Sequence, residues 1–137
     1  MLIDIKGRMA EESIKEILEY AIYPDPDKVD KTLMEYQSDP LLELMAIEDD
    51  GEIVGIIGFR LADRSLVIQH IAVHPEYRGM GYGRGLILEL IELKNPEKIT
   101  VETDEDAVEF YRNIGFSISS LGEKYPGVER YQCEYHI

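Results

Sequence analysis

The chain has 137 residues, of which 45% are hydrophobic and 31% are charged, as in an ordinary globular protein. This length predicts one domain over residues 1–137, with room for a sizeable core. The formal net charge of −14 disfavours nucleic acid as the main partner, because phosphate contacts need a basic surface. It favours a neutral or cationic partner, although acidity that serves only solubility explains the charge as well.

The expected location follows from features that the sequence lacks. No apolar run is long enough to span a membrane, and residues 1–4 do not resemble the start of a signal peptide. Cys133 is the only cysteine, so an intrachain disulfide is impossible, in agreement with a reducing compartment. We therefore expect a cytoplasmic protein that does not bind membranes.

In the first forty residues we expect a short strand over 2–5 and two helices. Apolar residues at helical spacing predict the first helix over 10–21. Asp25 followed by Pro26 suits the N-cap and first turn of the second helix, which Asp39–Pro40 should end.

Three strands are predicted next, over 41–48, 53–59 and 66–73. Asp50–Gly51 marks a tight turn between the first two. Residues 53–59 are almost continuously apolar, as expected of a strand buried on both faces. Gly55 and Gly58 inside this run predict the close approach of another backbone.

The rest of the chain alternates again between helix and strand. A strongly apolar helix should follow Gly85 and stop at Asn95–Pro96. After a strand over 99–102, Thr103 and Asp106 form a capping-box-like helix start, and Gly115 is the expected C-terminal stop. The inner residues expected for this helix are Ala107, Phe110, Tyr111 and Ile114. Strands over 116–121 and 128–135 complete a pattern that predicts an α+β protein with a mixed central sheet.

The segment from Ile71 to Gly85 carries the clearest chemical signal. An apolar strand ends at His74–Pro75, and a loop rich in arginine and glycine leads into a helix. Amides at a helix N-terminus attract anions, and Arg78 and Arg84 add two cations. The spacing of the glycines excludes the G-x-G-x-x-G dinucleotide fingerprint and the Walker loop. A tight turn without a ligand is the structural alternative.

Two motifs in these residues resemble the GCN5-related N-acetyltransferase (GNAT) superfamily. Its acetyl-CoA signature, Gln/Arg-x-x-Gly-x-Gly/Ala, is matched by Arg78, Gly81 and Gly83. The preceding strand and its His74–Pro75 exit fit as well. A second block, a helix bearing a tyrosine and ending in Gly-Phe, is matched by residues 107–116.

This resemblance implies the acyl-CoA N-acyltransferase fold, a three-layer α/β/α arrangement around a largely antiparallel sheet of about seven strands with one splayed pair. It also implies binding of acetyl-CoA, with no metal. The pyrophosphate would lie on the loop amides and the pantetheine arm on the strand before the loop. The implied cofactor-binding residues are Ile71, Ala72, Val73, Arg78, Gly79, Met80, Gly81, Tyr82, Gly83 and Arg84.

The implied activity is transfer of an acetyl group from acetyl-CoA to a primary amine by direct attack on the thioester. By position, the amide of Val73 would stabilise the oxyanion, and Tyr111 would protonate the leaving thiolate. Glu102 is the preferred general base, directly or through water. The structural alternatives are a core-edge aromatic for Tyr111 and a solvent-facing carboxylate for Glu102. A Cys-linked acetyl enzyme is not expected, because Cys133 should lie away from both motifs.

The acceptor pocket is less well defined by the sequence, and Gln69, Asp104 and Arg130 are its candidate residues. Asp104 could instead cap the following helix, and Arg130 could belong to a solvated hairpin. We expect His70 to be a hydrogen-bonded structural histidine. The amine itself, and whether the protein forms a homodimer, stay open. An acetyl-CoA-binding sensor without turnover is the alternative function.

Overall fold

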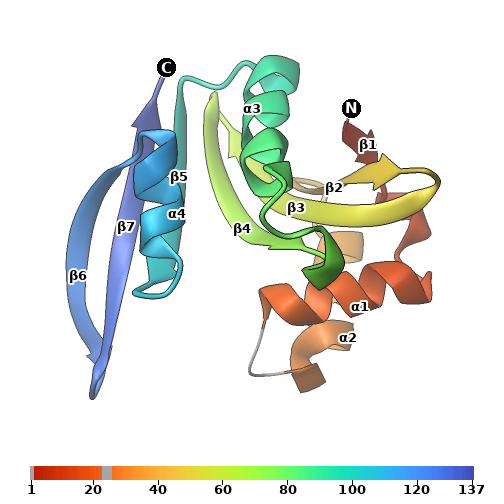
Figure 1. Cartoon of the computed structure of the whole chain (residues 1–137), viewed down its shortest axis with the longest axis horizontal. Helices are drawn as coiled ribbons and strands as arrows, with labels where there is room; N and C mark the ends of the chain where they lie inside the picture. The colour runs from red at the N-terminus through yellow and green to blue at the C-terminus, as the bar shows by residue number, and fades with distance from the viewer. Residues whose placement is uncertain (1, 23–25) are drawn as a thin grey trace. The chain divides into compact units, whose positions relative to one another are not determined.

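The computed structural model describes residues 2–22 and 26–137, and within them it has four α-helices and seven strands (Figure 1). In chain order they are β1 (Leu2–Asp4), α1 (Glu12–Ala21), α2 (Val29–Ser38), β2 (Leu42–Asp49), β3 (Glu52–Ala62), β4 (Ser65–Val73), α3 (Tyr82–Lys94), β5 (Lys98–Asp104), α4 (Val108–Ile114), β6 (Ser117–Tyr125) and β7 (Val128–His136). The N-cap predicted at Asp25 lies outside the described residues. No helix among them is long and apolar enough to cross a membrane.

The strands form a seven-stranded sheet in the order β1-β2-β3-β4-β5-β7-β6. β4 and β5 run parallel, with Ser65 opposite Lys98 and Val67 opposite Thr100. The pairs β1–β2, β2–β3, β5–β7 and β6–β7 are antiparallel. The predicted α+β class and the mixed, largely antiparallel sheet of seven strands are therefore confirmed.

The chain divides into two compact units, and each is described by itself. The first unit contains residues 1–60 and 69–95, and the second contains residues 61–68 and 96–137. That the whole chain is one domain stays a prediction.

In the first unit, helices cover both faces of the strands. α1 and α2 lie on one face of β2 and β3, and α3 lies on the other (Figure 1). A cluster of buried apolar side chains joins α1 and α2 to the sheet. Its members include Ile14, Ile17, Leu18, Val29, Leu33, Leu44, Ala46 and Ile56. Burial of these side chains supplies the main driving force for folding of this unit.

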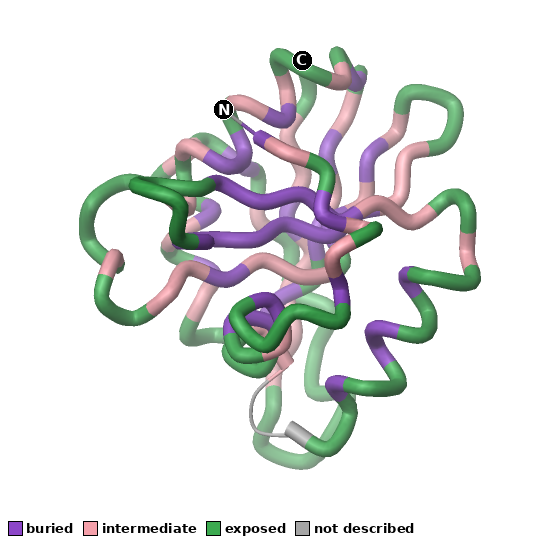
Figure 2. Tube along the Cα trace, turned by 90° about the vertical axis from the view of Figure 1, so that its right-hand side faces the viewer, coloured by how far each residue is buried: buried purple, intermediate pink, exposed green. Residues whose placement is uncertain are grey.

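β3 is the central strand of this unit. Every residue from Ile53 to Phe59 is buried, as the continuous apolar run predicts. Buried segments such as this one are purple in Figure 2. The turn that precedes β3 has positive φ at Asp50 (50°) and Gly51 (81°), which confirms the tight hairpin.

The two glycines of β3 make room for different neighbours. A Cβ on Gly55 would lie 3.3 Å from the carbonyl oxygen of Ala72 and 3.2 Å from Leu86 Cδ1, so the predicted close backbone approach is confirmed there. At Gly58 the prediction is wrong, because the space that a Cβ would need is filled by the ring and hydroxyl of Tyr36. The sequence indicated that another group lies close to Gly58, but it did not show that this group is the side chain of Tyr36.

The second unit packs α4 with β5, β6 and β7. Val108 and Tyr111 are the buried residues of α4, while Ala107, Phe110 and Ile114 are only half-buried. The ring of Tyr111 contacts Phe110 and Phe116, with centroids 5.0 and 5.3 Å away. Gly115 ends the helix at φ 118°, as predicted. β6 is exposed along most of its length, and its pairing with β7 is irregular at two places, between Ser120 and Gly122 and between Glu123 and Tyr125.

The start of α4 differs from the predicted capping box. Thr103 is buried within β5, and Asp104 instead accepts a hydrogen bond on Oδ1 from the Ala107 amide, 3.0 Å away. β5 extends to Asp104, beyond the predicted end at residue 102, and this extension draws Thr103 into the strand. Sheet pairing therefore overrides the local capping signal.

The packing of Gly58 predicts opposite effects for two glycine substitutions. Gly58→Ala forces the buried Tyr36 ring to move and should lower the free energy of unfolding by about 1–3 kcal/mol. Gly85→Ala is the matched control, because Gly85 lies in α3 with no atom within 4 Å of an added Cβ, and should raise that free energy by up to about 1 kcal/mol. Urea unfolding of both variants tests this, and equal stabilities would contradict the assigned packing.

Candidate functional site

The candidate site begins where β4 ends. Ala72 is buried, whereas Ile71 and Val73 are half-buried. The His74 amide donates to the Val54 carbonyl at 2.8 Å, which ties the strand exit to β3. The His74 side chain then accepts a hydrogen bond from the Glu76 amide at 3.2 Å and caps a short 3-10 turn, Pro75–Tyr77. The chain therefore leaves the sheet in a defined direction.

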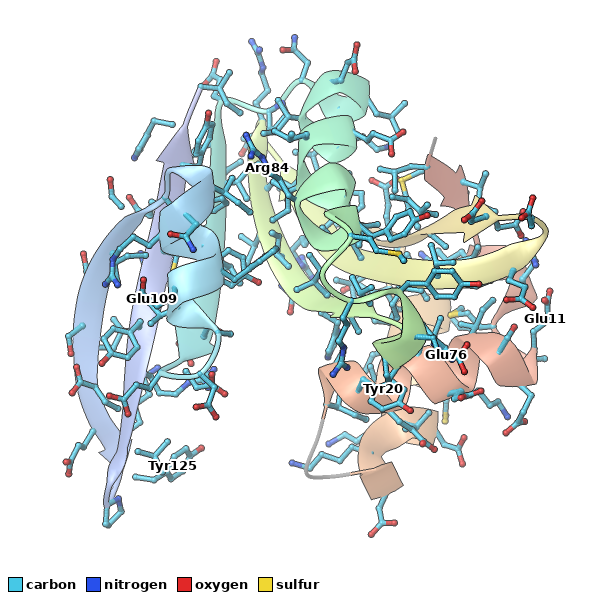
Figure 3. The ribbon with its side chains drawn as sticks, in the orientation of Figure 1. Glu11, Tyr20, Glu76, Arg84, Glu109 and Tyr125 are labelled. Atoms are coloured by element: carbon cyan, nitrogen blue, oxygen red, sulfur yellow. The ribbon has the colours of Figure 1, made fainter. Side chains whose placement is uncertain are left out.

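The loop that follows is exposed and shorter than predicted. Arg78, Gly79, Met80 and Gly81 are all exposed, and α3 begins at Tyr82. The predicted loop over Arg78–Gly85 is therefore wrong at its end, because Gly83, Arg84 and Gly85 form the first turn of the helix; Figure 3 labels Arg84 on α3. Burial of Leu86, Ile87 and Leu90 outweighs the poor helix propensity of the glycines.

Gly81 sets the geometry of the helix start. It is the N-cap of α3 in the left-handed conformation, with φ 86°, which disfavours residues that carry a Cβ. The first hydrogen bond of the helix runs from the Gly85 amide to the Gly81 carbonyl at 2.9 Å. The amides of Tyr82, Gly83 and Arg84 thus have no carbonyl one turn back within the helix and are available to an anion.

Two tyrosines hold this loop against the β2–β3 hairpin. The Tyr77 hydroxyl donates to Glu52 at 2.9 Å, and the Tyr82 hydroxyl donates to Asp49 at 3.1 Å. Their rings meet edge to face, with centroids 6.0 Å apart. Sequence reasoning missed this anchoring role, although the tyrosines on either side of Arg78–Gly81 were the available signal. Both hydroxyls have a raised pKa, chiefly through their carboxylate hydrogen bonds.

Arg78 is engaged with the protein itself. Its Nε donates to the Val73 carbonyl at 3.1 Å, and its guanidinium carbon lies 5.3 Å from the centroid of the Tyr20 ring of α1. Tyr20 is labelled in Figure 3. A hydrogen bond and a cation–π contact therefore fix the direction of this side chain. The residue holds the strand end in place in addition to contributing positive charge.

The catalytic candidates belong to the second unit. Tyr111 is 2% exposed, and burial is the main reason that the pKa of its hydroxyl is raised. Glu102 is exposed and accepts hydrogen bonds from Lys124 (2.9 Å) and Arg130 (3.1 Å). The bond from Lys124 contributes most to lowering the Glu102 pKa, so this carboxylate is ionised at neutral pH. The structure thus brings Glu102 and Arg130 together.

Cys133 lies closer to the second motif than predicted. It is fully buried on β7, and its charge would raise the pKa of Tyr111 by electrostatic repulsion. The expectation that Cys133 lies away from both motifs is therefore wrong, because α4 packs beside β7. Burial raises the pKa of the Cys133 thiol, which disfavours the reactive thiolate.

His70 has the structural role that the sequence predicts. Its Nδ1 lies 2.7 Å from the hydroxyl of the buried Tyr36, which therefore joins α2 to β4. Burial is the main cause that lowers the His70 pKa, and the charge of Glu35 opposes it. The imidazole is accordingly neutral at pH 7 and shares this hydrogen bond with the Tyr36 hydroxyl.

The acetyltransferase (GNAT) family model matches residues 10–116. The chain therefore belongs to the acetyltransferase (GNAT) family, and the predicted enzyme class, an N-acetyltransferase, is confirmed.

Individual relatives agree with this assignment. A Bacillus subtilis (strain 168) protein provisionally named [ribosomal protein bS18]-alanine N-acetyltransferase is 25% identical over 114 residues, which cover 79% of this chain and 76% of the relative. The solved structure of a provisionally assigned GNAT acetyltransferase from Desulfovibrio desulfuricans is 16% identical, with a TM-score of 0.83 over 99% of this chain and 98% of that chain. An aminoglycoside 6'-N-acetyltransferase solved with coenzyme A is also 16% identical, with a TM-score of 0.78 over 99% and 96% of the two chains. At 16% identity, these two solved structures show that the fold is shared and nothing more.

The burial of His70 predicts a specific pH dependence of stability. Its pKa is lower in the folded chain than the ordinary value of 6.5, so the unfolded chain binds more protons just below that pH. The stability contributed by neutral His70 is therefore present above pH 6.5 and is lost as the pH falls below it. His70→Gln can still accept from Tyr36 but cannot titrate.

Urea unfolding of the wild-type and His70→Gln proteins between pH 5.5 and 7.5 measures this effect. The stability of the wild-type protein relative to the variant should decrease on acidification, while titration of the other groups cancels. A difference that stays constant across this range would show that His70 does not resist protonation in the folded state.

Proposed function

We propose that this protein transfers the acetyl group of acetyl-CoA to a primary amine, by direct attack of the amine on the thioester. The observation that carries the proposal is the exposed Arg78–Gly81 loop at the N-terminus of α3, in a chain of the GNAT family. The relatives that support it have names that specify an alanine or an aminoglycoside as the acceptor. Because they are enzymes, the alternative of a sensor without turnover is not favoured.

The loop fits the phosphate groups of a coenzyme A moiety. A Cβ added at Gly79 or Gly81 would meet no atom within 4 Å, so the backbone faces open space there. The amides of Tyr82, Gly83 and Arg84 would donate to the pyrophosphate, and the helix dipole would stabilise its charge. The backbone of Ile71, Ala72 and Val73 would hold the pantetheine arm.

The proposed reaction needs a neutral amine, an oxyanion donor and a proton for the leaving sulfur. The amine nitrogen forms a bond to the thioester carbon, and the carbon–sulfur bond breaks as the amine loses a proton. The Val73 amide would stabilise the oxyanion. The Val73 carbonyl, which belongs to the next peptide group, accepts a hydrogen bond from Arg78, and this contact holds the end of the strand beside the proposed donor.

Two side chains of the second unit are proposed for the proton transfers. Tyr111 would protonate the leaving thiolate, and the raised pKa of its hydroxyl keeps it in the protonated form that a donor requires. Glu102 would accept the proton of the amine through water. Because its pKa is lowered, the carboxylate is a weak proton acceptor, and a water-mediated route is favoured over direct abstraction. Asp104, whose Oδ1 is bonded to the Ala107 amide, and Arg130, which is bonded to Glu102, stay acceptor-pocket predictions.

Gly81→Val should weaken the binding of acetyl-CoA at least about tenfold, equivalent to about 1.4 kcal/mol. A branched side chain disfavours φ 86° and would stand in the space in front of the loop amides. Isothermal titration calorimetry with acetyl-CoA measures the change.

Gly127→Val is the matched control for Gly81→Val. Gly127 also has positive φ (77°) and open space around it, but it lies in the turn between β6 and β7. It should lose a similar amount of stability and keep its acetyl-CoA affinity. Wild-type affinity in Gly81→Val would contradict the assignment of the loop.

Tyr111→Phe should lower the rate of acetyl transfer by roughly 10²-fold, a typical loss for a general acid, while acetyl-CoA affinity changes little. The phenyl ring keeps the contacts with Phe110 and Phe116, so the variant should fold. Steady-state kinetics over pH 6–9 separate kcat from KM. Tyr125→Phe is the control, since Tyr125 is 67% exposed at the end of β6 (Figure 3). Equal turnover in the two variants would remove Tyr111 as the acid.

A further inference from the structure

The exposed loop before α3, residues 78–81, is held at both ends by one neighbouring hairpin. Immediately before the loop, the Tyr77 hydroxyl donates to Oε2 of Glu52 at 2.9 Å. Immediately after it, the Tyr82 hydroxyl donates to Oδ2 of Asp49 at 3.1 Å. All four residues between the tyrosines are exposed, so the loop has no buried side chain of its own to fix its conformation.

The two acceptors of these hydrogen bonds have a fixed spacing. Asp49 and Glu52 lie opposite each other as the last pair of the β2–β3 ladder, and Asp50 and Gly51 join them. The positive φ of these two turn residues, 50° and 81°, defines a tight turn. The rings of the two tyrosines also contact each other, with centroids 6.0 Å apart. The end of the hairpin therefore sets the position of both ends of the loop.

The charge of these acceptors has the wrong sign for the surroundings of a phosphate site. The hydrogen bond to Glu52 is the main reason that the pKa of Tyr77 is raised, and the charges of Asp49 and Glu76 add to this effect. Glu76 is labelled in Figure 3. Because like charges repel, these carboxylates disfavour an anionic ligand as far as solvent leaves them unscreened. Any favourable contribution to phosphate binding must come from the hydrogen bonds that they accept.

The loop backbone has conformational freedom that a ligand would have to restrict. Gly79 and Gly81 have positive φ, 79° and 86°, and a Cβ added to either would meet no atom within 4 Å. Glycines in such open surroundings carry the largest backbone entropy. The tyrosine contacts restrict the loop before a ligand binds, and a loop that is already ordered binds more tightly. Tyr82 is also the first residue of α3, so its contact directs the amides that follow.

We infer that Asp49 and Glu52 are positioning residues of the acetyl-CoA site. Through Tyr82 and Tyr77 they hold the loop amides in the arrangement that receives the phosphate groups, and neither carboxylate contacts the ligand. The inference rests on the proposed function, because it takes the N-terminus of α3 as the phosphate site. It extends that site to the end of the β2–β3 hairpin, which lies outside the glycine motif.

Two substitutions of Asp49 separate the effect of position from that of charge. Asp49→Ala removes the acceptor and the charge, whereas Asp49→Asn removes the charge and keeps an oxygen that can accept from Tyr82. Asp49→Ala should raise the Kd of acetyl-CoA about fivefold, and Asp49→Asn should recover most of this loss. Isothermal titration calorimetry measures both affinities. Glu52→Ala and Glu52→Gln should follow the same order through Tyr77.

A double-mutant cycle tests whether the effect passes through the tyrosine. Tyr82→Phe removes the hydroxyl and keeps the ring, so it should raise the Kd about as much as Asp49→Ala does. In the Tyr82→Phe background, Asp49→Ala should cause little further loss, because the hydrogen bond is already absent. Asp30→Ala is the matched control. It removes an exposed carboxylate from the first turn of α2 and should leave the Kd unchanged.

Three results would overturn the inference. Tighter binding by both Asp49→Ala and Asp49→Asn would show that only the charge matters. An equal loss in both variants would show that the hydrogen bond does not position the loop. A wild-type Kd together with a lower free energy of unfolding in urea would assign the contact to stability alone.

NMR relaxation of the backbone amides of Gly79 and Gly81 in the ligand-free protein distinguishes the two proposals. The order parameters should fall in Asp49→Ala, whether or not acetyl-CoA is the ligand. Such a fall, without any binding of acetyl-CoA by the wild-type protein, would support the role of the hairpin and contradict the proposed function. Acetyl-CoA binding by the wild-type protein, with unchanged order and Kd in Asp49→Ala, would support the proposed function and contradict the positioning role.

Discussion

The contact of Tyr36 with β3 and β4 is the constraint on which the first unit depends. Gly58 leaves the space that the buried ring occupies, and the hydroxyl bonds to His70. Together these contacts set the position of α2 on the sheet, because a ring packed on a bare backbone segment tolerates little displacement. Gln69, which stays an acceptor-pocket prediction, lines a pocket together with Glu35 and Ser38 on the same turns of α2, so the shape of this pocket follows from the packing of Tyr36.

The second constraint is that the proposed anion site belongs to an acidic chain. Its net charge of −14 cannot attract a phosphate over a distance, so the attraction must be local. Backbone amides at the N-terminus of α3 supply it without adding a side-chain charge. Even the carboxylates of Asp49 and Glu52 are used locally, since they accept hydrogen bonds from Tyr82 and Tyr77 and thereby hold the loop.

The sequence predicted most elements because hydrophobic periodicity and the turn residues agree with each other along the chain. The errors arise where contacts with segments that are distant in the sequence determine the local structure. Whether Gly58 faces backbone or Tyr36 depends on where α2 packs, and Thr103 joined β5 because that strand pairs with β7 up to Asp104. The exposed glycine-containing turn before α3 was predictable from local spacing, but the pocket at Gln69 joins residues from four elements and has no local signature.

The irregular strand β6 has a consequence for the behaviour of the protein in concentrated solution. It ends the sheet, so one of its edges carries backbone groups that another chain could pair with. The two interruptions of its register with β7, together with Gly122 at φ 79°, bend that edge away from the flat geometry that strand addition requires. Glu123 and Lys124 place charges on the same stretch. The strand thereby resists edge-to-edge aggregation, even though it is exposed along most of its length.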